Sequence, residues 1–184
     1  MVGLFGAAFN PPHNGHVALA AAAQEQFGLE RLVILVTANP AHKHVAEDVE
    51  TRLELARAAF PGHELEREES TSDVTVREAE ARYGDVIFLI GADQFVDFPG
   101  WHDPEAVLEH ARLGVAMRPG YRREQLEEAL SRVSRPERVL FFDLPPWPLA
   151  SRDLRARVGR GESLEGLTPP DVARLIEARG LYRP

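Results

Sequence analysis

Residues 2–16 read VGLFGAAFNPPHNGH, an apolar run that ends in two prolines and two histidines. A continuous apolar run such as Val2–Phe9 favours a strand that is buried on both faces. The two prolines force the chain out of regular structure directly after it. Residues 16–27 are rich in alanine and carry no breaker, and Gly28 follows as a typical helix stop. This opening therefore predicts a strand, a turn and a helix in succession.

The same alternation continues along the whole chain. Residues 31–37 (RLVILVT) and 86–91 (VIFLIG) are apolar almost throughout, as in strands of a parallel sheet that helices cover on both faces. Further strands are expected at 113–117 and 139–143, and helices at 51–60, 77–83, 104–110, 123–132, 151–160 and 169–178. Strands that alternate with helices predict a doubly wound parallel α/β sheet with three layers, α/β/α. We expect one domain over residues 1–184, in which residues 151–184 form a C-terminal helical portion.

Composition excludes several classes of protein and of site. The chain of 184 residues has 44% hydrophobic and 27% charged residues, which is typical of globular proteins. Its lack of cysteine excludes disulfides, cysteine-ligated zinc and thiol nucleophiles, and fits a reducing compartment. A net charge of −8 argues against a broad nucleic-acid-binding surface. Because no apolar stretch is long enough to span a bilayer and no signal peptide is visible, we expect a cytoplasmic protein without a membrane partner.

Three turns are expected to carry the chemistry, because ligands of such sheets bind beyond the carboxyl ends of the strands. These turns are residues 9–16, 38–44 and 91–101. His13 and His16 lie three residues apart at the start of a predicted helix, so both imidazoles share a face with its N-terminal N–H groups. Such a donor cluster suits a polyphosphate. Two alternatives stay open: a proline turn with a capping histidine, and a two-histidine metal site, for which no third ligand is visible at a suitable spacing.

Five segments carry a resemblance to a known family. The stretch FNPPHNGH (9–16) matches the H-x-G-H signature of the nucleotidyltransferase superfamily. Four others resemble the nicotinate-mononucleotide adenylyltransferases, in that family's order: NPAHK (39–43), GAD (91–93) with Trp101 eight residues on, RPGY (118–121) and LTPPDVARLIEARGLY (167–182). The signature alone indicates only the superfamily, whereas the ordered set, which runs from Gly3 to Tyr182, is specific.

The resemblance implies transfer of AMP from ATP to the 5′-phosphate of nicotinate mononucleotide in NAD biosynthesis, with release of pyrophosphate. Nicotinamide mononucleotide is a second expected acceptor, and Mg²⁺ is expected to arrive with ATP, held mainly by phosphate oxygens. The attacking phosphate is already anionic, so catalysis requires positioning and charge neutralisation rather than a strong base.

The resemblance also assigns residues, and we expect the catalytic ones to converge on one pocket. Catalytic roles are implied for His13, His16, Lys43 and Arg155. ATP binding is implied for Phe9, Asn10, His13, Gly15, His16, Ser151, Arg152 and Arg155. Mononucleotide binding is implied for Lys43, Asp73, Gly91, Asp93, Trp101 and Arg118, and no residue is assigned to a metal.

Two segments depart from the family pattern. Residues 149–155 read LASRDLR where the family has Ile-Ser-Ser-Thr-x-Ile-Arg, so we expect Ser151 to cap the helix and Arg152 to supply charge to phosphate. Residues 71–74 read TSDV in the loop that resembles the one recognising the nicotinate carboxylate, where Asp73 would repel an acid and favour an amide. These departures keep two alternatives open: a divergent nucleotidyltransferase with another phosphate acceptor, and a nucleotide-binding sensor with weak catalysis.

Plainer structural roles are also open for several residues. Asp93 could be the N-cap of the next segment, Trp101 a partly buried core aromatic, and Lys43 part of a solvated loop. The charged run 64–69 is most simply a solvated face.

Overall fold

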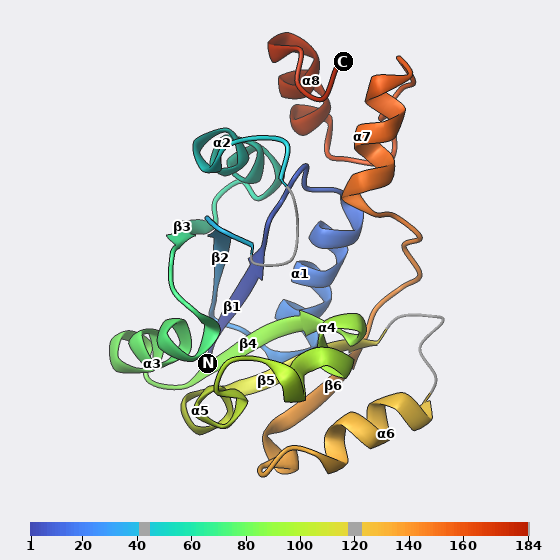
Figure 1. Ribbon diagram of the computed structural model, residues 1–184. Helices are drawn as coiled ribbons and strands as arrows, with labels where there is room; N and C mark the ends of the chain where they lie inside the picture. The colour runs from blue at the N-terminus through green and yellow to red at the C-terminus, as the bar shows by residue number, and fades with distance from the viewer. Residues whose placement is uncertain (41–44, 118–122, 184) are drawn as a thin grey trace. The chain divides into compact units, whose positions relative to one another are not determined.

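A computed structural model describes residues 1–40, 45–117 and 123–183, and its strands form one six-stranded sheet (Figure 1). The strands are β1 (Val2–Ala7), β2 (Arg31–Thr37), β3 (Glu64–Glu68), β4 (Val86–Gly91), β5 (Arg112–Met117) and β6 (Val139–Asp143). Their order is β3-β2-β1-β4-β5-β6, and β1–β4, β4–β5 and β5–β6 pair in parallel. This is the strand order of the doubly wound dinucleotide-binding fold. The predicted fold class is confirmed.

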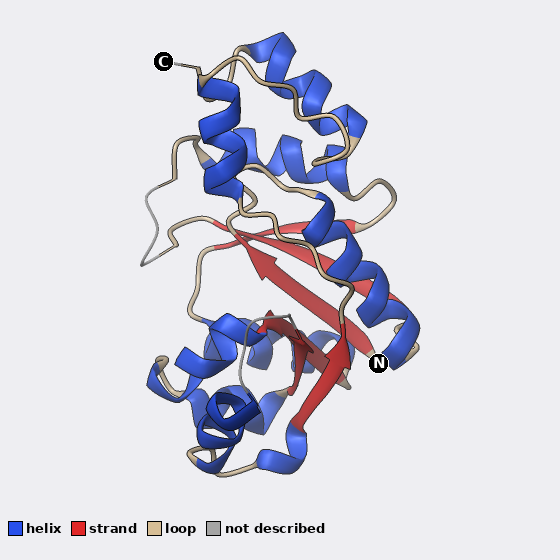
Figure 2. Ribbon diagram, turned by 90° about the vertical axis from the view of Figure 1, so that its right-hand side faces the viewer, coloured by secondary structure: helices blue, strands red, loops and turns tan. Residues whose placement is uncertain are grey.

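Helices connect successive strands, as the blue and red segments of Figure 2 show. They are α1 (Asn14–Phe27), α2 (Val49–Ala59), α3 (Ser72–Tyr83), α4 (Ala92–Asp97), α5 (Pro104–His110), α6 (Arg123–Ser131), α7 (Ser151–Gly159) and α8 (Pro170–Arg179), with 3₁₀ turns η1 (Phe98–Gly100) and η2 (Pro136–Arg138). All six residues of β4 are buried, as its apolar sequence predicts for a covered parallel strand.

The charged run 64–69 contains a strand, in which Arg67 and the following Glu69 are exposed as a solvated face predicts, whereas for Glu68 that interpretation is wrong. It forms β3, which lies at the edge of the sheet. Glu68 is buried there: a carboxylate oxygen accepts from Thr37 Oγ1 at 2.8 Å, and its carbonyl accepts from the Ala38 N–H at 2.7 Å. Because β3 is an edge strand, it pairs on one side only and tolerates charged side chains, and its sequence shows no apolar pattern.

Two other segments also differ from expectation. Helix α3 begins at Ser72 rather than at residue 77, so residues 72–74 form its first turn and not a loop. Helix α4 occupies much of the expected turn 91–101, and its N-cap is Gly91, not Asp93. The missed start of α3 covers only residues 72–76 and α4 has only six residues, so neither segment is long enough for helical periodicity to appear.

The chain divides into two compact units. Unit 1 comprises Met1–Gly6, Leu19–Val33 and Ser70–Pro146, and unit 2 comprises Ala7–Ala18, Ile34–Glu69 and Trp147–Pro184. Within unit 1, α3 packs against α5 and α4 against α6. Within unit 2, α2 packs against α8, and Arg179 pairs with Glu54 at 2.5 Å. The expectation of a single domain stays a prediction.

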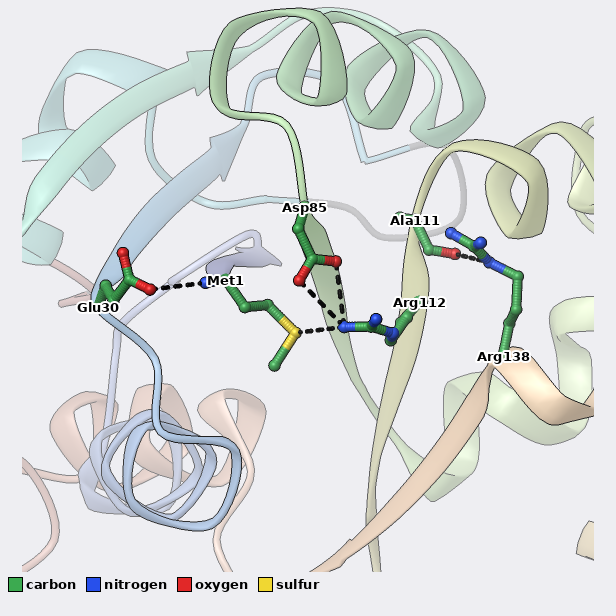
Figure 3. Close-up of polar contacts among 6 residues, drawn as sticks. All are labelled: Met1, Glu30, Asp85, Ala111, Arg112 and Arg138. Atoms are coloured by element: carbon green, nitrogen blue, oxygen red, sulfur yellow. Dashed lines mark hydrogen bonds and ion pairs between the residues drawn. The ribbon is translucent and has the colours of Figure 1, made fainter.

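Polar contacts join the amino ends of the strands in unit 1. Figure 3 shows the residues involved, each at or directly before the first residue of a strand: Met1, Glu30, Asp85, Ala111, Arg112 and Arg138. Arg112 Nη1 lies 3.0 Å from Asp85 Oδ1, and the Met1 ammonium lies 3.1 Å from Glu30. Exposed pairs of this kind contribute about 0–1 kcal/mol each. These contacts connect the amino ends of the strands, whereas ligands of such sheets bind beyond the carboxyl ends.

Candidate active site

The turn after β1 brings the two histidines of the H-x-G-H segment together. Helix α1 begins at Asn14, so His13 directly precedes the helix and His16 lies in its first turn. The two rings stack with centroids 3.8 Å apart, and the His13 N–H donates to His16 Nδ1 at 3.2 Å. The edge of the Phe9 ring meets His16 at a centroid distance of 5.2 Å. The expected histidine pair is thus present at a helix N-terminus.

The bond to Nδ1 determines what His16 can offer a ligand. A neutral imidazole carries one N–H, so a ring that accepts at Nδ1 has its proton on Nε2. His16 is half-buried at the positive end of the α1 dipole, and His13 is buried beneath it. This bond is the capping contact of the alternative interpretation, and it is made through Nδ1. The arrangement therefore combines a helix cap with a donor suited to phosphate.

Asn10 is the point at which distant segments of unit 2 meet the first turn. Its carbonyl accepts from Arg155 Nη1 at 2.6 Å, and its side-chain oxygen accepts from the Tyr182 hydroxyl at 2.9 Å. Ser151 Oγ donates to the Pro11 carbonyl at 2.9 Å. Burial raises the pKa of Tyr182, so its hydroxyl remains a donor at neutral pH. Helix α7 and the C-terminal segment together brace the turn that holds the histidines.

The start of α7 differs from the sequence prediction, because Ser151 is not the cap. Ala150 occupies the N-cap position in extended conformation, and the Ser151 hydroxyl is used by the Pro11 carbonyl. The Arg152 side chain is 82% exposed, and its Nε lies 3.5 Å from Asp153 Oδ1. A phosphate role for Arg152 stays a prediction.

Gly15 allows the histidines to lie close to their surroundings. A Cβ at this position would lie 3.0 Å from Cε1 and Nδ1 of His13 and 3.3 Å from Cβ of Trp147. Both distances are shorter than ordinary van der Waals contact. A side chain at this position would therefore require His13 or Trp147 to shift by a few tenths of an ångström.

In unit 1, the carboxylate of Asp73 is paired rather than open. It is buried in the first turn of α3, with Oδ1 3.2 Å from Nδ1 of the exposed His102. Burial raises the pKa of Asp73, but hydrogen bonds from Thr71 and His102 outweigh it and hold the pKa below its ordinary value. Asp73 is therefore an ionised group whose charge His102 can share.

The other predicted residues of unit 1 follow β4. Gly91 donates its N–H to Gln94 Oε1 at 3.3 Å, and Asp93 lies in the first turn of α4. Trp101 is half-buried, and its ring meets the ring of buried Phe98 edge to face, with the two ring centroids 5.3 Å apart. Its position fits both a core contact and a partly open ring face. Lys43 and Arg118 lie outside the described residues, so the convergence of all four catalytic residues stays a prediction.

Sequence reasoning missed Arg52 and Tyr182. Arg52 lies on α2 and is only 1% exposed, in contact with main-chain carbonyls. The sequence did indicate that Arg52 is buried, because Leu55, Ala56 and Ala59 follow it at the three-, four- and seven-residue intervals of a buried helix face. An arginine on an apolar face marks a buried polar contact.

Comparisons with known proteins agree with this geometry. The Cytidylyltransferase-like family model matches residues 4–157. A protein of Exiguobacterium sibiricum named "Probable nicotinate-nucleotide adenylyltransferase" is 37% identical, with 98% of each chain covered. A relative of the same name from Thermus thermophilus is 35% identical, with 99% of each chain covered.

A solved structure supports the same fold. The chain is similar to Plasmodium falciparum nicotinic acid mononucleotide adenylyltransferase complexed with NaAD, with a TM-score of 0.77 and 13% identity over 98% of this chain and 96% of that one. In the described parts of the chain no helix has the length and apolarity to cross a membrane. With a family model over most of its length and relatives above 30% identity end to end, the chain belongs to the Cytidylyltransferase-like family and, within it, to the nicotinate-nucleotide adenylyltransferases.

Proposed function

We propose that this chain transfers AMP from ATP to nicotinate mononucleotide, with nicotinamide mononucleotide as a second acceptor, and releases pyrophosphate in NAD biosynthesis. The observation that carries the proposal is the stacked His13–His16 pair at the N-terminus of α1. The names of full-length relatives support the choice of acceptor. The lack of cysteine suits a reducing compartment, and we place the protein in the cytoplasm.

The reaction makes one bond and breaks one. An oxygen of the mononucleotide phosphate attacks the α-phosphorus of ATP, and the bond from that phosphorus to the bridging oxygen of the β-phosphate breaks. The electron pair leaves with pyrophosphate. Because the nucleophile is anionic, the protein's task is to align the two phosphates and to neutralise the charge that builds on them.

Residues of unit 2 are assigned to ATP. His16 directs a proton on Nε2 at a phosphate oxygen, and the N-terminal end of α1 adds its dipole. Arg155 and Ser151 hold the turn, and we assign Phe9, Asn10, His13, Gly15 and Arg152 to the same side, with Lys43 as a further cation.

Residues of unit 1 are assigned to the mononucleotide, together with Lys43. Trp101 offers a ring face to the pyridine, worth roughly 1–3 kcal/mol by analogy with base–aromatic stacking. The other residues of this group are Asp73, Gly91, Asp93 and Arg118.

Mg²⁺ enters the proposal as part of the ATP complex. Magnesium prefers oxygen ligands and keeps several waters. Within residues 1–40, 45–117 and 123–183 there is no group of three or more His, Asp or Glu side chains that could hold a metal. Phosphate oxygens are therefore its proposed main ligands.

The proposal is tested by pyrophosphate release from ATP with each mononucleotide, beside calorimetry with ATP alone. Release with nicotinate mononucleotide supports it. ATP binding without release would favour a sensor, and release with only an unrelated phosphate acceptor would favour a divergent transferase.

Gly15→Ala is expected to lower kcat roughly tenfold. The new Cβ presses on the His13 ring, which must then shift by a few tenths of an ångström. A misplacement of about 1 Å costs roughly 100-fold in rate, so this smaller shift is expected to cost less. Steady-state pyrophosphate release measures the effect, with Gly159→Ala as control because its Cβ would have no neighbour closer than 3.9 Å. Equal kcat for Gly15→Ala and the parent would show that the ring has room.

Asp73→Asn is expected to raise the acid-to-amide ratio of kcat/KM about tenfold, equivalent to 1.4 kcal/mol. Two charges 4 Å apart repel by about 4 kcal/mol at an effective dielectric of 20, and the contact of His102 with the Asp73 carboxylate reduces this repulsion. His102→Ala should move the ratio in the opposite direction. Glu78→Gln, on the exposed side of α3, is the control. The pair is excluded from the site if two results are found together. The parent prefers the acid by more than about tenfold, and neither Asp73→Asn nor His102→Ala changes the acid-to-amide ratio of kcat/KM.

A further inference from the structure

Arg52 is a buried guanidinium whose donors are directed at the main chain. It is 1% exposed, and four hydrogen bonds join it to carbonyls. Nη1 donates to Ala8 at 2.9 Å and Thr37 at 2.7 Å, Nη2 to Ala38 at 2.9 Å, and Nε to Glu47 at 3.1 Å. Burial lowers the pKa of Arg52, but arginine remains protonated in proteins. Burying such a charge is costly unless it is well bonded, so the four bonds are what make the position possible.

The acceptors lie where two functional turns begin. Ala8 follows β1 and opens the turn that carries His13 and His16. Thr37 ends β2, and Ala38 opens the turn that follows it. Glu47 precedes Asp48, the N-cap of α2. One side chain therefore joins three separate segments of unit 2 at the carboxyl ends of two strands.

These bonds also determine the direction of the peptide N–H groups. In a planar trans peptide the C=O and the following N–H point in opposite directions. The peptide after Thr37 shows the result: its carbonyl accepts from Arg52, and its N–H, on Ala38, donates to the Glu68 carbonyl at 2.7 Å. By the same geometry, the bond to Ala8 turns the N–H of Phe9 away from Arg52, at the entrance to the first turn.

We propose that Arg52 is a positioning residue for adenylyl transfer, which holds the turns after β1 and β2 at a fixed spacing and orientation. It acts through the turn that carries His13 and His16, without contact to substrate. This inference rests on the proposed function. A residue that merely filled volume could be replaced by another cation of similar length, whereas a residue that sets geometry requires the planar fork of the guanidinium.

The test is Arg52→Lys, with Arg57→Lys as the matched control on the exposed face of the same helix. Lysine keeps the charge, but its single nitrogen cannot reproduce the four bonds. We expect kcat to fall by at least about tenfold, because small misplacements of reacting groups are costly. KM for ATP should change less than about threefold, with a cooperative melt retained. The ring ¹H–¹⁵N signals of His16 should also shift, since its tautomer depends on the bond from the His13 N–H.

Each outcome decides the inference. Arg52→Lys with parental kcat and unchanged His16 signals would overturn it. Should Arg52→Lys lose its cooperative melt, Arg52→Gln, which keeps a planar donor group, is compared in the same way. Failure of both variants to fold would assign Arg52 to folding and overturn the positioning role. A parent that releases no pyrophosphate from any pyridine mononucleotide refutes the proposed function first, and the His16 signals then still decide whether Arg52 orients the turn.

Discussion

Replacing His16 by alanine is expected to lower kcat about 100-fold or more, because one preorganised donor to the transition state is worth about 2.7–4 kcal/mol in comparable sites. The ring is half-buried, and its bond to the His13 N–H places the proton on Nε2. The fold should survive, since one cap contact is worth only about 1 kcal/mol. Pyrophosphate release at saturating substrates and a thermal melt measure both effects.

Two conservative variants distinguish the two roles of His16, as an acceptor that caps the helix through Nδ1 and as a donor through Nε2. Asparagine can place an acceptor near the position of Nδ1, and glutamine can place an N–H donor near the position of Nε2. If the donor carries catalysis, His16→Gln should retain more activity than His16→Asn, whereas a pure cap would give the reverse order. Near-full activity of His16→Ala with a normal melt would remove His16 from the catalytic set.

His13→Ala is expected to lower kcat by a similar factor of about 100, but with a loss of stability as well. His13 is 4% exposed and stacks on His16 with ring centroids 3.8 Å apart. Its removal leaves a void beneath the ring of His16, and core truncations of this kind commonly cost about 1–3 kcal/mol. The melting temperature should therefore fall below that of His16→Ala. Equal stability of the two variants would show that His13 does not support the ring above it.

Strands with a continuous apolar sequence could be predicted, both β2 and β4 inside the sheet and β6 at its edge. The bounds expected for β2, β4 and β6 are those of the structure, and α5 likewise spans 104–110 as expected. Each of these strands is dominated by β-branched, aliphatic or aromatic residues over five to seven positions. Such runs favour a strand whether it lies inside the sheet or at its edge.

Elements whose burial depends on their neighbours could not be predicted. The sequence ELERE of β3 carries no apolar alternation, and it becomes a strand because Thr37 and Ala38 offer partners to Glu68. Helix α4 has six residues, too few for helical periodicity to appear. The first turn of α3 carries Asp73, which contacts His102 from 29 residues away.

The same distinction holds for the candidate site: features that depend on nearby residues could be predicted, and contacts between distant residues could not. The sequence by itself determined the strand, the proline turn and the helix that holds two histidines at its N-terminus, because all of these depend on neighbours within a few residues. Only the tertiary structure decided that Tyr182 bonds to Asn10 across 172 positions, and that Arg52 joins carbonyls from two turns. Backbone carbonyls are alike at every position in a sequence, so which of them a buried donor will reach is decided by packing alone.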